Sequence, residues 1–160
     1  MIHDVTLVVH IAAGSAGLVL GPIAMFAGKR RGVHTRAGVT YHWIVLLVSV
    51  SAIVLSALDW SEIWWFTPIA LFSYAFALTG YLAAKRRRPG WLAVHIAGQG
   101  GSYIALVTAL LVVNLGDALI IWFIPTIVGS PIIAWVQYQV ATGRRPKGAA
   151  VPAGQTFAAS

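Results

Sequence analysis

Hydrophobic residues along the chain fall into five long stretches, which short charged segments separate. No Asp, Glu, Lys or Arg occurs within residues 5–28, 37–58, 63–84, 89–116 or 118–143. A helix needs about 20 mostly apolar residues to cross the hydrocarbon core of a bilayer, so each stretch is long enough for one crossing. The pattern predicts an all-α integral membrane bundle of five transmembrane helices, over about residues 5–27, 38–58, 62–84, 91–114 and 118–140.

The composition agrees with a membrane protein and excludes several other classes. Of the 160 residues, 59% are hydrophobic and only 9% are charged, whereas about 25% are charged in a typical soluble domain. The chain has no cysteine, which excludes disulfides and thiolate metal sites. We therefore expect one transmembrane domain over residues 1–142 and a disordered cytoplasmic tail, rich in Gly, Ala and Pro, over residues 143–160.

The charged residues predict the orientation of the helices. All eleven basic residues lie between the first and second predicted helices, between the third and fourth, or in the tail, and all four acidic residues lie elsewhere. Because cytoplasmic loops are rich in Lys and Arg, we expect the N-terminus outside and the C-terminus in the cytoplasm of a bacterial, multi-pass plasma membrane protein. The net charge of +7 is then a topology signal, and we expect lipid contacts and no nucleic acid binding.

Polar and small side chains recur at helical spacing within four of the predicted helices. A side chain facing lipid tails finds no hydrogen-bond partner, so these stripes are expected to face the bundle interior. The glycines among them also allow close helix packing without any ligand. The stripes are His10, Gly14, Gly17 and Gly21; His42, Ser49 and Ser56; Thr67, Tyr74 and Tyr81; and His95, Gly98, Gln99 and Ser102.

Three of the five histidines lie within predicted helices, and ionisable residues inside a membrane usually mark a functional site. His42 follows Arg36 by six residues and His95 follows Arg88 by seven, so both lie at nearly equal depth and form a candidate pair. His10 lies near the opposite face, as a second-site ligand or a proton-handling group. His34 is expected in the cytoplasmic loop.

Two facing imidazoles without acidic or sulfur ligands favour haem b over zinc or copper. In this hypothesis His42 and His95 are the axial metal ligands, Gly98 admits the flat ring, and Arg36 pairs with a propionate. Two alternatives stay open. The histidines act as hydrogen-bonded links between helices or as a proton relay, or they bind another metal.

One motif at the start of the second helix resembles a known family. His34-Thr-Arg-Ala-Gly-Val-Thr-Tyr41 is similar to the H-x-R-x-G-x-x-Y pattern of small multi-pass bacterial membrane proteins that form the domain-of-unknown-function family 2306. Two further matches are His10 followed by small residues, and His95 followed by Ser102 and Tyr103. The family's usual basic residues after this last histidine are replaced by Ile96, Ala97 and Gly98. The resemblance covers most of residues 8–110.

Histidines on inner helix faces are also similar, in architecture, to membrane b-type cytochromes of the cytochrome b561 group. Together these features predict an electron-transfer protein with haem inside the bundle, held by His42, His95, His10, Arg36, Gly98 and Tyr103. Quinone is the expected redox partner. The alternative is a cofactor-free small transporter or an accessory subunit of a larger membrane complex. The expected protein partners are further copies of the same chain, in a homo-oligomer, or the other subunits of such a complex.

Overall fold

The computed structural model describes residues 1–28, 32–116 and 118–143. These residues form six α-helices and no β-strand. Five helices are long and apolar enough to cross a membrane, which confirms the predicted all-α class and the number of spans. The helices are α1 (Ile2–Phe26), α2 (Val33–Leu58), the short α3 (Trp60–Ile63), α4 (Phe66–Arg86), α5 (Trp91–Leu115) and α6 (Leu119–Ala141).

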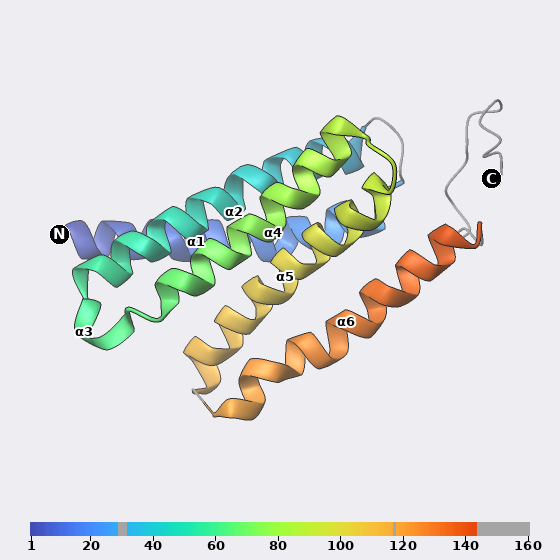
Figure 1. Ribbon diagram of the computed structural model, residues 1–160. Helices are drawn as coiled ribbons and strands as arrows, with labels where there is room; N and C mark the ends of the chain where they lie inside the picture. The colour runs from blue at the N-terminus through green and yellow to red at the C-terminus, as the bar shows by residue number, and fades with distance from the viewer. Residues whose placement is uncertain (29–31, 117, 144–160) are drawn as a thin grey trace.

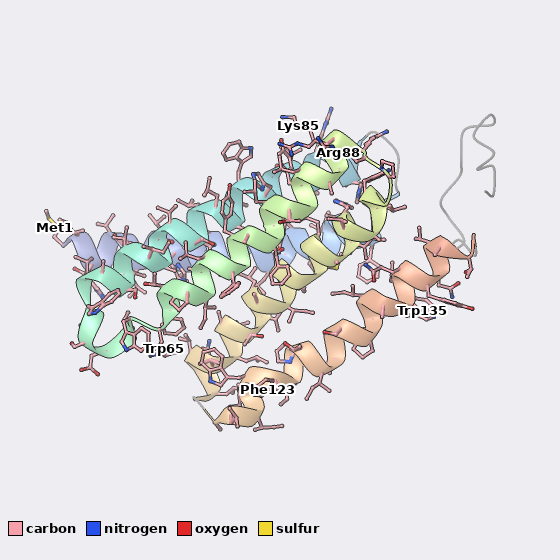
Figure 2. The ribbon with its side chains drawn as sticks, viewed as in Figure 1. Met1, Trp65, Lys85, Arg88, Phe123 and Trp135 are labelled. Carbon is pink, nitrogen blue, oxygen red and sulfur yellow. The ribbon has the colours of Figure 1, made fainter. Side chains whose placement is uncertain are left out.

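Successive long helices run in opposite directions, so the chain turns back at alternate ends of the bundle (Figure 1). Arg36 and Lys85–Arg88 lie at the end where α2 and α5 begin, which we call the basic end (Figure 2). Asp4, Asp59 and Glu62 lie at the other end. The predicted separation of charge is therefore present among the described residues. The predicted tail lies outside them, apart from Gly143.

Helix packing is organised around α2, α4 and α5. Helix α1 packs along α2, α4 packs along α5 and against α2, and α6 packs against α5 (Figure 1). Tyr41, Val45 and Ala77 form the buried core cluster between α2 and α4. Many larger apolar side chains point outward instead, as expected for a bundle whose surface is solvated by lipid tails.

The predicted polar stripes face the interior in most cases. His42, Ser49 and Ser56 on α2 are 3%, 4% and 0% exposed, and Thr67 on α4 donates a 2.9 Å hydrogen bond to Ser56. Gly14 departs from the pattern, because no atom comes within 4 Å of the position that a Cβ would take there.

Candidate functional site

A pair of histidines lies at the basic end, where α2 and α5 begin. Helix α2 starts at Val33, so His34 belongs to its first turn, and His95 belongs to the second turn of α5. The centres of the two imidazole rings are 6.2 Å apart, and the ring planes meet at 79°. Both side chains are half-buried. We call His34 and His95 the histidine pair.

Each member of the histidine pair is oriented by a backbone carbonyl of a neighbouring helix. The Nδ1 atom of His34 is 2.7 Å from the carbonyl oxygen of Ala24 in α1, and Nδ1 of His95 is 2.9 Å from that of Gly80 in α4. A carbonyl only accepts, so each Nδ1 carries a proton. Histidines that ligate metals commonly have this arrangement, in which the second nitrogen donates to a carbonyl.

Two arginines lie at the same end of the bundle as the pair. The ring of Trp91 is centred 6.2 Å from that of His95, and the guanidinium of Arg87 lies 5.4 Å from the centre of the Trp91 ring. Arg36 is exposed and follows His34 by two residues. A ligand with anionic groups would meet a favourable potential at this end of the bundle.

His42 lies in a different environment, against α4. Its ring stacks on Tyr81, with ring centres 4.2 Å apart and planes at 8°, and the Tyr74 ring is 5.7 Å away. The Nδ1 atom of His42 is buried without a hydrogen-bond partner among the described residues. The ring beside His95 is thus that of His34, whereas His42 is covered by tyrosines. That His42 and His95 share one ligand stays a prediction.

Helix packing fills the space beside Gly98, the glycine expected to admit a flat ring. A Cβ on Gly98 would lie 2.6 Å from the backbone nitrogen of Gly80 and 2.7 Å from the carbonyl oxygen of Phe76. Helices α4 and α5 therefore touch backbone to backbone at this point, in the manner of small residues at membrane helix contacts. No space remains beside Gly98 for a porphyrin.

Tyr103 also serves helix packing. Its ring covers Gly21 of α1, and its hydroxyl donates a 3.2 Å hydrogen bond to the Leu18 carbonyl. Leu106, one turn further along α5, fills the space beside Gly17. These contacts join α1 to α5, and they account for the Gly17 and Gly21 positions without a ligand.

His10 is separate from the histidine pair. It lies in the half of α1 nearer the acidic residues, half-buried, with Nδ1 2.9 Å from the Ser51 hydroxyl and 3.2 Å from the Val48 carbonyl. These two bonds link α1 to α2. Within the described ranges, no group of three or more His, Cys, Asp or Glu side chains comes together in a way that could hold a metal ion.

The family resemblance is confirmed by comparison with known families. The model of the family described as "Predicted membrane protein (DUF2306)" matches residues 7–141. The chain belongs to the DUF2306 family. No curated protein and no solved structure matches it.

The first and last residues of the motif that carries the resemblance each contact α5 in this DUF2306 protein. His34, its first residue, is part of the histidine pair, and Tyr41, its last, forms a 3.1 Å hydrogen bond with Ser102 of α5. Sequence reasoning placed His34 in a loop and so missed the pair. One signal in the sequence could have predicted the pair. His34 and His95 each lie within a few residues of a basic segment, and the two basic segments are expected at the same membrane face.

Proposed function

We propose that this DUF2306 protein is a membrane b-type cytochrome that carries electrons, in which His34 and His95 would hold the haem. The observation that carries the proposal is the distance between the two rings. Two imidazoles that shared one metal, each with a metal–nitrogen distance of about 2 Å, would have ring centres no more than about 6 Å apart. The centres of the His34 and His95 rings are 6.2 Å apart.

The number of ligands favours haem over a bare metal ion. Zinc and similar ions need three or four protein ligands, and no such group comes together in the described part of the chain. A porphyrin supplies four nitrogens itself, so haem needs only two axial side chains.

The surrounding residues suit this role. Carbonyl contacts at Ala24 and Gly80 place a proton on Nδ1 of each imidazole and hold the orientation of its ring. Arg36 and Arg87 supply positive charge for carboxylates such as haem propionates. When bound, the haem supplies one-electron chemistry, and a membrane quinone is the proposed exchange partner.

We also propose an orientation for the protein in its membrane. The basic end faces the cytoplasm of a bacterial plasma membrane, and the N-terminus faces outward. The alternative is a cofactor-free transporter or an accessory subunit of a membrane complex. In that case the carbonyl bonds of His34 and His95 link α1 to α2 and α4 to α5 and do nothing more.

Absorption spectroscopy of the purified full-length protein tests the proposal. Cells are supplied with excess haem, and spectra are recorded on oxidised and dithionite-reduced protein. We expect a six-coordinate, low-spin b-type spectrum that is lost in His34→Ala and in His95→Ala. His10→Ala is the matched control, because it also removes a half-buried helix histidine, and it should keep the spectrum.

The His42→Ala variant distinguishes the two versions of the site. A normal spectrum in His42→Ala with loss in His34→Ala supports the histidine pair. The reverse result would support the sequence-based pair of His42 and His95 and refute the assignment of His34. Colourless protein that contains no metal by elemental analysis would refute the cytochrome proposal, and metal without a haem spectrum would indicate a bare ion at the same imidazoles.

A further inference from the structure

A small cavity lies between α2, α4 and α5, away from the histidine pair. Its volume is about 40 Å³, and residues of α2, α4 and α5 line it. A buried site of about 15 Å³ is already large enough for one water molecule. Most of the lining is aliphatic, but three hydroxyl-bearing residues, Ser49, Ser73 and Ser102, line it, one from each helix.

The hydrogen bonds of these three serines leave complementary groups for a water molecule. Ser73 donates to the Ile69 carbonyl at 2.7 Å and Ser102 donates to the Gln99 carbonyl at 2.9 Å, so each keeps a lone pair that accepts. Ser49 is 4% exposed and lines the cavity, and its hydroxyl proton is not taken by either of these two carbonyls. It is therefore the group with a proton to donate.

The same site is connected to a buried tyrosine. Tyr41 is 2% exposed, and its hydroxyl lies 3.1 Å from the Ser102 hydroxyl. Because Ser102 uses its only proton on the Gln99 carbonyl, Tyr41 is the donor in this bond. Tyr41 is thus joined by a hydrogen bond to Ser102, which lines the cavity.

We infer that the cavity is a water-binding site. One water molecule accepts from Ser49 and donates to Ser73 and Ser102, which gives it the three bonds that buried waters typically make. The water completes a chain of hydroxyl groups from Ser49 to Tyr41. This inference does not depend on a metal at the histidine pair.

Water-edited solid-state NMR of the full-length protein in lipid bilayers tests the inference. Magnetisation from water should reach Ser49, Ser102 and the Tyr41 ring several-fold faster than it reaches Ala77, which is fully buried and does not line the cavity. Transfer to Ser49 and Ser102 as slow as the transfer to Ala77 would show a dry cavity and overturn the inference.

Variants at Ser49 then test the proposed bonds. Ser49→Val removes the donor and fills the space, so transfer to Ser102 and Tyr41 should fall to the Ala77 level. Ser56→Ala is the matched control, because Ser56 is a fully buried serine on the same face of α2 but bonds to Ile63 and Thr67 and does not line the cavity. Unchanged transfer to Ser102 in Ser49→Val, or an equal loss in Ser56→Ala, would contradict the proposed role of Ser49.

Discussion

The contact between α4 and α5 at Gly98 provides the sharpest test of the packing. A Cβ placed on Gly98 would meet three backbone atoms, the nitrogen and Cα of Gly80 and the oxygen of Phe76, at 2.6 to 2.7 Å. Backbone atoms cannot rotate away as side chains can. To reach an ordinary contact of 3.4 Å, α4 must move by about 0.8 Å.

Such a movement also disturbs hydrogen bonds that cross the same interface. The His95 Nδ1–Gly80 bond of 2.9 Å and the Gln99 Nε2–Ala77 bond of 3.0 Å would lengthen toward about 3.7 Å, beyond hydrogen-bonding distance. Overpacking costs about 1–3 kcal/mol and each lost bond about 1 kcal/mol. Since the helices relax to share these costs, we expect Gly98→Ala to lower the free energy of unfolding by about 2–3 kcal/mol.

The measurement is denaturant-induced unfolding in detergent micelles, followed by the helical circular dichroism signal. Gly14→Ala is the matched control, because a Cβ there meets no atom within 4 Å, and alanine favours the helix slightly more than glycine. We expect Gly14→Ala to be as stable as wild type or slightly more stable. Gly98→Ala with wild-type stability, or equal destabilisation by both substitutions, would refute the close contact.

Two further predictions concern topology and the α1–α5 contact. Reporter fusions after Gly32, Pro89 and Gly148 should give cytoplasmic signals, and fusions near Trp60 and Gly116 should give external ones. The reason is that basic residues gather in cytoplasmic loops, and here they are separated from the acidic residues. An external signal from a fusion in either basic loop would contradict the predicted orientation. Tyr103→Phe should lower the free energy of unfolding by about 1 kcal/mol, because only the hydrogen bond to Leu18 is lost. Tyr103→Ala should lower it by about 3 kcal/mol or more, because it also empties the space over Gly21. Equal losses in the two variants would show that the ring contributes little.

The polar stripes show how far helical periodicity alone reaches. On α5 the stripe of His95, Gly98, Gln99 and Ser102 faces α4 and α2, through bonds to Gly80, Ala77 and Tyr41 and the contact at Gly98. Periodicity identifies this face because polar groups avoid lipid. It does not say which neighbour each side chain meets, or whether a glycine leaves room for a ligand or for another backbone.

The sequence by itself determined the number of long apolar helices, their approximate bounds and the separation of charge between the two ends. The bilayer allows little else, because every backbone polar group must be bonded within a helix and each crossing needs about 20 apolar residues. Even so, hydropathy missed the short α3, since one turn of helix leaves no periodic signal.

Only the tertiary structure decided which histidines meet. His42 and His95 have similar depth in the sequence, but depth says nothing about the rotation of a helix about its axis. Packing turns His42 onto Tyr81, and the extension of α2 back to Val33 brings His34 beside His95. The rotation is set by close contacts such as that of Gly98 with Gly80, which depend on the shapes of two helices together and which neither helix encodes alone.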